Sequence, residues 1–402
     1  MMIGRTLPPA TAPIVPFDLI GGFVGMLSAS RSIERFHKSL RAQFGMKHCF
    51  TFSSGKTGIT ITLRALHQRH PKRDLVVIPA FNCYSVPSAI VRAGCTVYPC
   101  DIDPENLNFN ETALTKVLAN HERILAVCPA HLFGLPANIK RIRELIHDPE
   151  ITIIEDAAQA MGTALNNPSA LIGDVVIFSL GRGKAFSTGE GGVVVTNNDH
   201  IANMIHQTAS SLPEYSHTQV AVLITQCIIL LILIHPRLFW IPKAIPFLKL
   251  GDTIFDAKFP MRVLSGFQAG CAVRWQKRLM VFNKERDCHS NYYSASLSSL
   301  KRVQLFVRKN DSVPCIRFPV LFESPAIAQK VLMEGDRNGL GIACTFPDAI
   351  DMIPGISIFT TTPCLQARSV ARRILTLPCH PLVRKADMDK IIEIIRSCTG
   401  EP

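Results

Sequence analysis

One lysine in this sequence has neighbours that suit covalent chemistry with carbonyl groups. Lys184 lies between an apolar stretch that ends at Leu180 and a tight turn from Gly189 to Gly192. An amine forms Schiff bases when it is partly desolvated and its neighbours lower its pKa. A lone lysine in a loop is usually solvated, but these two flanks favour a deep position for Lys184.

Two acidic residues, Glu155 and Asp156, follow directly after the apolar run ITII. A buried carboxylate costs free energy unless a cation meets it. A protonated pyridine nitrogen is one such cation, and a carboxylate opposite it makes the ring a better electron sink. An aspartate that caps a helix is the commoner explanation for this pattern taken alone, so Asp156 becomes a candidate only together with Lys184.

The segment SSGKTG, which contains Gly55, Lys56 and Thr57, suits an anion. It lies where a strand-like run meets a helical pattern, and the amino end of a helix with small residues can approach and stabilise a phosphate. It is not a P-loop, because the glycine-to-lysine spacing of that motif is absent. A short glycine turn is weak evidence when it stands alone.

Alternating strands and helices must position these residues. Seven apolar runs indicate strands, and they are CFTF, DLVVIPA, CTVYPCDID, RILAVCPA, ITIIEDAAQA, DVVIFSL and GGVVVTNN. Apolar strands without alternation, separated by helical patterns, predict an α/β protein with a mainly parallel sheet that helices cover on both faces. Ligands of such sheets bind at the carboxyl ends of the strands, where most of the residues above lie.

The chain of 402 residues is long enough for two packed lobes. From about Cys315 the pattern changes to a smaller α+β lobe, with CIRFPVLF as a strand and DMDKIIEIIRSCTG as the closing helix. We predict a large domain over 1–255 with an apolar insert at 220–248. Interface helices and a small carboxyl-terminal domain are predicted over 256–402.

Charge and cysteine content narrow the possible partners and the compartment. The 43 basic and 31 acidic residues give a net charge of +12, which favours anionic ligands. There is no zinc-finger spacing, RNA-binding aromatic signature or long Lys/Arg run, so nucleic acid is not expected. The 13 cysteines form no metal-type grouping, and prolines interrupt any signal peptide at the amino terminus. We therefore expect a cytoplasmic protein with reduced thiols and no metal.

These elements together resemble the DegT/DnrJ/StrS-type sugar aminotransferases, a branch of the fold-type-I pyridoxal-phosphate enzymes. The resemblance covers roughly residues 30–210 and 255–397, and EDAAQA followed by S-x-x-x-x-K and GEGG is its most specific part. Its other carriers are SSGKTG, VVIPAFNCYSVPSAIVRAGCTVYPCDIDPENLNFN, PAHLFGLPANI and ILTLPCHPLVRKADMDKIIEII.

The resemblance implies roles for individual residues. Lys184 would carry pyridoxal phosphate as a Schiff base and later move the substrate proton. Asp156 would pair with the pyridine nitrogen, and Gln159 would lie near the ring oxygen. Ser179 would bind the phosphate. His131 matches a common family residue, and a structural role for it is preferred over direct catalysis.

The turn expected to bind the phosphate departs from the family pattern. Gly55 and Lys56 would form the turn, where relatives have Gly-Thr or Ala-Thr, so that Thr57 is a candidate replacement for the hydroxyl.

The aromatic ring that relatives stack on the cofactor aligns with Cys83, which leaves Phe81 and Tyr84 as open alternatives. In FPMRVLSGFQAG the inter-subunit Asn of relatives is absent, and Arg262 is the substitute we consider.

The apolar run from Val220 to Ile234 has no counterpart in the family pattern. It has 15 residues, fewer than the roughly 20 needed to cross a bilayer. A core helix is one interpretation. The following Arg237, Trp240, Lys243 and Lys249 favour instead a helix that lies in a membrane interface, or a shallow re-entrant hairpin.

The predicted activity is an aminotransferase that moves an amino group, with glutamate as the expected donor, to a keto group of a sugar-like acceptor. The acceptor is expected to be nucleotide-linked or lipid-linked. We expect a homodimer, with peripheral contact at the inner face of the membrane through 220–248. Two alternatives remain: a dehydratase on the same fold, which the presence of Lys184 disfavours, and a non-catalytic, membrane-associated binding or regulatory protein.

Overall fold

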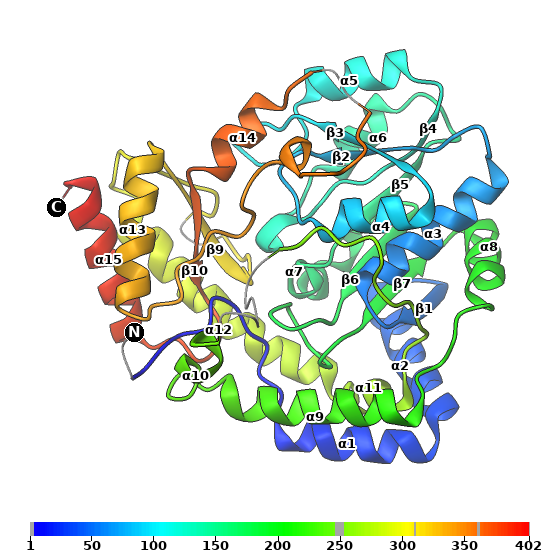
Figure 1. The fold of residues 1–402 in the computed structure, drawn as a ribbon, viewed down its shortest axis with the longest axis horizontal. Coiled ribbons are helices and arrows are strands. Elements are labelled where there is room, and N and C mark those ends of the chain that lie inside the picture. The colour runs from blue at the N-terminus through cyan, green and yellow to red at the C-terminus, as the bar shows by residue number, and fades with distance from the viewer. Residues whose placement is uncertain (1–3, 246–252, 309–310, 360–361, 402) are drawn as a thin grey trace.

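The computed structural model describes residues 4–245, 253–308, 311–359 and 362–401. Its centre is a sheet with the strand order β1-β7-β6-β5-β4-β2-β3 (Figure 1). The strands in that order are β1 His48–Phe52, β7 Gly192–Thr196, β6 Val175–Ser179, β5 Thr152–Asp156, β4 Ile124–Val127, β2 Leu75–Pro79 and β3 Thr96–Cys100. The β6–β7 and β7–β1 pairs are antiparallel, and the others are parallel. The predicted seven-stranded, mainly parallel sheet is confirmed.

Helices cover both faces of this sheet, as expected for strands that are apolar along their whole length. One face is covered by α3 Gly55–Arg69, α4 Ser85–Ala93 and α8 Asp199–Ala209, whose apolar residues share a core with β6 and β7. The other face packs against α2 Ala29–Phe44 and α7 Met161–Asn166. The remaining elements at the sheet are α5 Glu111–Asn120, α6 Ile139–Leu145 and two 3-10 turns, η1 Leu132–Gly134 and η2 Pro168–Ala170.

A smaller α+β lobe follows the long helix α12, Trp275–Leu297. Its antiparallel sheet has the order β10-β9-β8, with β8 Val303–Leu305, β9 Arg317–Phe322 and β10 Ile374–Pro378. Helices α13 Pro325–Arg337 and α15 Lys385–Thr399 share its core, and η4 Ile350–Met352 and α14 Leu365–Ala371 lie between β9 and β10 in sequence. The predicted boundary near residue 255 stays a prediction.

A helix that the sequence analysis did not predict, α1 Pro16–Leu27, packs closely on α11, Gly266–Cys271. Glycines make this approach possible. A Cβ on Gly25 would lie 2.3 Å from the main-chain oxygen of Gly266, and a Cβ on Gly270 would lie 2.2 Å from that of Gly21. Proline at the first position of a helix costs no hydrogen bond, so Pro16 is compatible with the start of α1.

The apolar insert forms helix α9, His217–Leu233, beside α1, and the short helix α10, Trp240–Lys243 (Figure 1). Only Leu223 and Cys227 of α9 are fully buried. No helix in the described residues is long and apolar enough to cross a membrane. Residues 246–248 of the predicted insert, and Lys249, lie outside the described residues.

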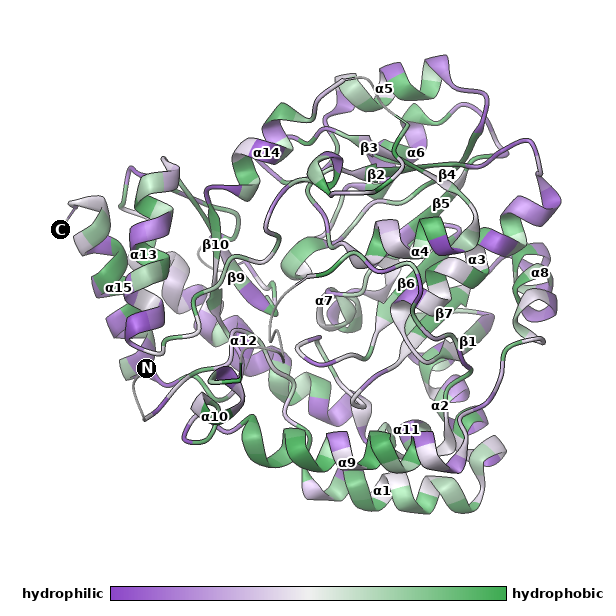
Figure 2. Ribbon diagram, in the orientation of Figure 1, coloured by the Kyte–Doolittle hydropathy of each residue, from purple (hydrophilic) through white to green (hydrophobic). Residues whose placement is uncertain are grey.

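Both α9 and α1 expose apolar side chains, and Figure 2 shows them as neighbouring hydrophobic ribbons. On α9 the exposed residues include Ile229 and Ile232, with 48% and 51% of their surface accessible. Those of α1 are Phe17, Ile20, Phe23, Val24, Met26 and Leu27. Helix α9 is therefore neither a fully buried core helix nor long and apolar enough to cross a membrane.

Candidate active site

Three of the predicted site segments meet at one edge of the large sheet. Asp156 is the last residue of β5, Ser179 is the last residue of β6, and the loop after β6 carries Lys184. Parallel strands end at the same edge, so β5 and β6 bring these residues together. Helix α3 begins at the same place, because a Cβ on Gly55 would lie 3.3 Å from the Cβ of Ser179.

Asp156 and Lys184 are electrostatic neighbours. Burial raises the pKa of Asp156, and the charge of Lys184 acts in the opposite direction. The Oδ1 atom of Asp156 accepts a hydrogen bond of 3.1 Å from the amide of Ala158. Within the described part of the chain, Oδ2 accepts no hydrogen bond. A buried carboxylate with a free oxygen suits a cationic ligand such as a protonated ring nitrogen.

The loop that carries Lys184 is held by an arginine that the sequence analysis missed. Arg286 on α12 is only 1% exposed. Its guanidinium donates hydrogen bonds to the main-chain oxygens of Ala185 at 2.8 Å and of Lys184 and Thr11 at 3.4 Å. These bonds fix the main chain at the candidate lysine. Nothing in the helical pattern of 267–297 distinguished Arg286 from the other basic residues there.

The turn at the start of α3 presents main-chain amides that can donate hydrogen bonds to an anion. Ser54 caps the helix, and its hydroxyl accepts a hydrogen bond of 3.1 Å from the amide of Thr57. The hydroxyl of Thr57 is fully buried and bonds to the hydroxyls of Ser53 and Ser54 at 3.1 and 3.0 Å. The amides of the first turn, beside Ser179, are thus a candidate phosphate site that does not need the Thr57 hydroxyl.

The side chain of Lys56 turns toward the segment after the insert. Its Nζ atom lies 4.3 Å from the ring centre of Phe259. Burial lowers the pKa of Lys56, while Asp256, Cys83 and Glu190 act to raise it. Lys56 is therefore a half-buried cation with the carboxylates of Asp256 and Glu190 within electrostatic range.

Gln159 and His131 are both fixed by hydrogen bonds near the end of β5. The Oε1 atom of Gln159 accepts from the amide of Phe133 at 2.9 Å. His131 accepts from the amide of Ala137 at Nδ1, at 2.9 Å, which leaves Nε2 to donate to Glu155 at 2.8 Å. Glu155 is fully buried and also accepts from the amide of Gly173. These contacts agree with a structural role for His131.

Both aromatic candidates for ring stacking are packed elsewhere. Phe81 is fully buried and makes an edge contact with Phe346, with ring centres 5.1 Å apart. The hydroxyl of Tyr84 donates to the main-chain oxygen of Asp348 and accepts from its amide, both at 3.1 Å. Cys83, between them, is half-buried. The choice between Phe81 and Tyr84 as the residue that stacks on a cofactor ring therefore stays open.

Arg262 lies beside the phosphate turn of its own chain. Its amide donates to the hydroxyl of Ser53 at 3.1 Å, and its main-chain oxygen accepts from the amide of Ser53 at 2.9 Å. Its guanidinium lies 5.4 Å from the ring centre of Tyr215. Together with Glu190, both residues line a cavity of about 250 Å³ next to α9.

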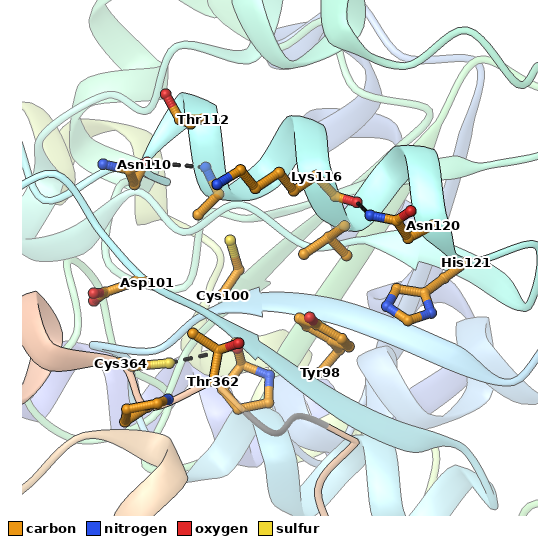
Figure 3. A pocket seen from close by; sticks show the side chains of 14 residues that line it. Tyr98, Cys100, Asp101, Asn110, Thr112, Lys116, Asn120, His121, Thr362 and Cys364 are labelled. Atoms are coloured by element: carbon orange, nitrogen blue, oxygen red, sulfur yellow. Dashed lines mark hydrogen bonds between the residues drawn. The ribbon is translucent and has the colours of Figure 1, made fainter.

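A larger cavity, of about 400 Å³, lies between α5 and the end of β3 (Figure 3). None of the predicted site residues lines it. Its carboxylate, Asp101, accepts hydrogen bonds from the amides of Ile102, Gln366 and Ala367, so it already caps the start of α14. The carboxylate of Asp101 already accepts three hydrogen bonds, and Lys184 does not line this cavity. The candidate active site is therefore the one at the sheet edge.

Known proteins resemble this chain in sequence and in fold. A model of the DegT/DnrJ/EryC1/StrS aminotransferase family matches residues 24–220 and 257–396. The GDP-perosamine synthase of Caulobacter vibrioides is 30% identical over 176 residues, which are 44% of this chain and 46% of that protein. The match thus spans about half the length of that relative.

Solved structures show the same fold at low sequence identity. PseC of Helicobacter pylori, an aminotransferase of pseudoaminic acid biosynthesis, has a TM-score of 0.77 at 15% identity, with 98% of this chain and 100% of that chain covered. The GDP-4-keto-6-deoxy-D-mannose-3-dehydratase of E. coli, with bound hydrated PLP, has a TM-score of 0.75 at 17% identity, with 98% and 100% covered.

Proposed function

Because the chain belongs to the DegT/DnrJ/EryC1/StrS aminotransferase family, we propose that it is a pyridoxal-phosphate-dependent aminotransferase whose Schiff-base lysine is Lys184. The observation that carries this proposal is that Lys184 follows β6 within electrostatic range of the buried Asp156, at the edge where Ser179 meets the start of α3. An amine, a carboxylate and a phosphate site at one sheet edge are the three groups that this cofactor requires.

The residues present fit the cofactor. The hydroxyl of Ser179 and the amides of the turn at Gly55, Lys56 and Thr57 would hold its phosphate, and Asp156 would face its ring nitrogen. When bound, pyridoxal phosphate supplies a carbonyl that combines with amines and a ring that withdraws electrons.

Each protein group has a separate task in the proposed reaction. The carboxylate of Asp156 would stand opposite the ring nitrogen and hold the proton there. The amine of Lys184 would hold the cofactor, and its Nζ atom would accept and return the substrate proton. Arg286 keeps the main chain of Lys184 in place through its carbonyl oxygen. Gln159 would lie near the ring oxygen.

The substrates are part of the proposal. Glutamate would give its amino group, and a keto sugar linked to a nucleotide or a lipid would receive it. The similarity to a GDP-perosamine synthase supports a sugar acceptor, and the net charge of +12 suits an acceptor with phosphoryl groups.

Two alternatives compete with this proposal. A dehydratase shares the fold. The family resemblance implies that dehydratases of this kind lack the Schiff-base lysine, so Lys184 disfavours that reaction. A non-catalytic binding protein is favoured by the departures at Lys56 and Cys83 and by Arg262 in place of the family's Asn.

Location and assembly complete the proposal. We propose a homodimer that touches the membrane surface through the insert 220–248 without crossing it. The exposed isoleucines of α9 and the aromatic and basic residues that follow them support this contact. Helix α1, which packs beside α9, widens the apolar surface.

The experiment that tests the activity is visible absorption spectroscopy of the purified protein with added pyridoxal phosphate, before and after glutamate. We expect a Schiff-base band that glutamate bleaches and that is missing in Lys184→Ala. A wild-type protein that stays colourless would contradict the aminotransferase proposal and favour the binding protein. A band that glutamate leaves unchanged would contradict the choice of donor.

A further inference from the structure

The amino-terminal strap, residues 5–14, forms no helix or strand, yet much of it is buried. At most 5% of the surface is exposed in Thr6, Leu7, Thr11, Ala12 and Ile14. The strap runs from the small lobe past α12 to the start of α1 (Figure 1). The family match begins at residue 24 and does not include it. Buried main chain outside regular elements must find hydrogen-bond partners elsewhere, and these partners show what the strap holds.

The first half of the strap is bound to the small lobe. Arg5 donates to the carboxylate of Asp387 on α15, from Nε at 3.1 Å and from Nη2 at 2.6 Å. Leu7 lies in the apolar core of this lobe. The Nε2 atom of the buried His380 donates to the main-chain oxygen of Pro8 at 2.8 Å. This half of the strap is therefore fixed relative to the small lobe.

The strap also contacts the insert at two places. The amide of Thr6 donates to the main-chain oxygen of Pro236 at 2.8 Å, just after α9. Near the other end of the strap, Ile14 shares an apolar cluster with Leu223 and Cys227 of α9. The strap thus lies between the insert and the small lobe, and it is held by both.

The second half of the strap lies against the loop that carries Lys184. Gly183 has a φ of 71°, and a Cβ on it would lie 3.4 Å from the main-chain oxygen of Ala10. The Nη2 atom of Arg286 donates to the main-chain oxygens of Thr11 and Lys184, both at 3.4 Å. The strap and the lysine loop therefore share one guanidinium and lie side by side at Gly183.

We infer that the amino-terminal strap positions Lys184, through the contact of Ala10 with Gly183 and the sharing of Arg286 by Thr11. Ala10 and Thr11 are positioning residues, because they act on the lysine only through these two neighbours. The value of this arrangement for catalysis rests on the proposed function of Lys184. A reacting group that is displaced by about 1 Å can lose roughly 100-fold in rate, so a held loop matters for such a lysine.

A simpler role for the strap is to stabilise the small lobe alone. The contacts of Arg5, Leu7 and Pro8 would be sufficient for that role, and those of Ala10 and Thr11 would not be needed. The two roles differ in what happens when the strap is loosened. A positioning strap releases the lysine loop, whereas a simple tether changes only the stability of the small lobe.

The experiment measures amide hydrogen exchange of residues 180–191 by mass spectrometry in the cofactor-free protein. It also measures the pH at which the Schiff-base band changes after pyridoxal phosphate is added. Thr11→Gly loosens the strap beside Arg286. Thr11→Val keeps the shape of a side chain whose hydroxyl forms no hydrogen bond with a described residue.

A second pair of variants tests the far end of the strap. Arg5→Gln removes the bond to Asp387. Its control is Arg302→Gln, because Arg302 also binds a carboxylate, that of Glu323, and a main-chain oxygen, that of Thr399, on the small lobe. Far-ultraviolet circular dichroism shows whether each variant folds, and the Arg5 pair retains the test should Thr11→Gly fail to fold.

We expect Thr11→Gly to raise exchange in 180–191 roughly two- to fivefold, because glycine adds main-chain freedom. The pH midpoint of the band should shift in the same variant, and Thr11→Val should match wild type in both measurements. Arg5→Gln should raise exchange in the loop more than Arg302→Gln does.

Wild-type exchange of 180–191 in a folded Thr11→Gly variant would overturn the inference and leave the strap as a tether of the small lobe. Equal loop exchange in Arg5→Gln and Arg302→Gln would overturn it as well. A wild-type protein without a Schiff-base band would instead contradict the proposed function. The exchange result would still decide the role of the strap, because it is obtained without the cofactor.

Discussion

The guanidinium of Arg286 holds the main-chain oxygen of Ala185 at 2.8 Å, one residue after Lys184. The arginine is buried, and burial lowers its pKa to about 10, so the charge is retained at neutral pH. It fixes the main chain of the lysine loop from a helix that starts far along the chain. The position of Lys184, the proposed reactive amine, therefore depends on contacts outside its own loop.

Replacing Arg286 with Met should destabilise the fold and loosen the lysine loop. Each buried carbonyl that loses its donor costs about 1–3 kcal/mol. We expect a lower urea midpoint and a weaker Schiff-base band at equal cofactor concentration. Arg286→Lys keeps the charge and one donor direction, so it should recover part of both. If the Arg286→Met variant has the stability and spectrum of wild type, the loop that carries Lys184 keeps its conformation without Arg286.

Replacing Asp156 with Asn should have opposite effects on the cofactor-free and cofactor-bound protein. Burial raises the pKa of Asp156 above its ordinary value of 3.8. A carboxyl group with a raised pKa in the folded state weakens the fold as the pH rises above that ordinary value. We therefore expect the cofactor-free Asn variant to be more heat-stable than wild type at pH 7, with the difference shrinking toward pH 4.

With cofactor bound, the same Asn variant should be less active, on the order of 100-fold, because it lacks the negative charge opposite the ring. Steady-state rates and thermal melts, each with and without cofactor, provide the test. If the Asp156→Asn substitution stabilises both forms equally, Asp156 does not face the cofactor.

Replacing Cys83 with Phe restores the ring type that the family resemblance predicts. Aromatic stacking contributes about 0.5–1.5 kcal/mol, so cofactor affinity should rise by roughly 2- to 10-fold. Equilibrium dialysis of the cofactor measures the effect. An unchanged affinity would mean that position 83 does not border the cofactor.

Replacing Ile228, Ile229 and Ile232 with Ser should weaken membrane contact. All three are exposed on one side of α9, and burial of an isoleucine in an apolar phase contributes about 1.5–3 kcal/mol. Co-sedimentation with vesicles that contain anionic lipid should fall more than roughly 10-fold, while the cofactor band stays unchanged.

A control for that experiment places Ser at Ile172, Met333 and Leu365, which are exposed elsewhere on the molecule. Vesicle binding by this control should match wild type. If the α9 variant instead binds vesicles normally but changes from dimer to monomer in light scattering, the apolar face of α9 is a subunit interface.

Much of the large lobe could be predicted because short stretches of the sequence determine where its strands lie. Apolar runs such as those that became β5 and β6 are buried on both faces, and that burial can be read from composition alone. Asp156 and Ser179 end those strands, so their meeting at one edge follows from parallel pairing. Helix α1 was not predicted because its apolar residues are not confined to one face of the helix. Its glycines allow close packing on α11, a contact that the sequence alone does not reveal.

The sequence by itself determined the chemical groups: a lysine before a glycine turn, an acid at a strand end, and small residues at a helix start. Only the tertiary structure decided which cations surround them. Arg286 and Ala185 are 101 residues apart, and no periodic pattern relates them. Contacts at that separation depend on how α12 packs against α7 and against the small lobe, because side chains meet there through folding rather than through spacing along the chain.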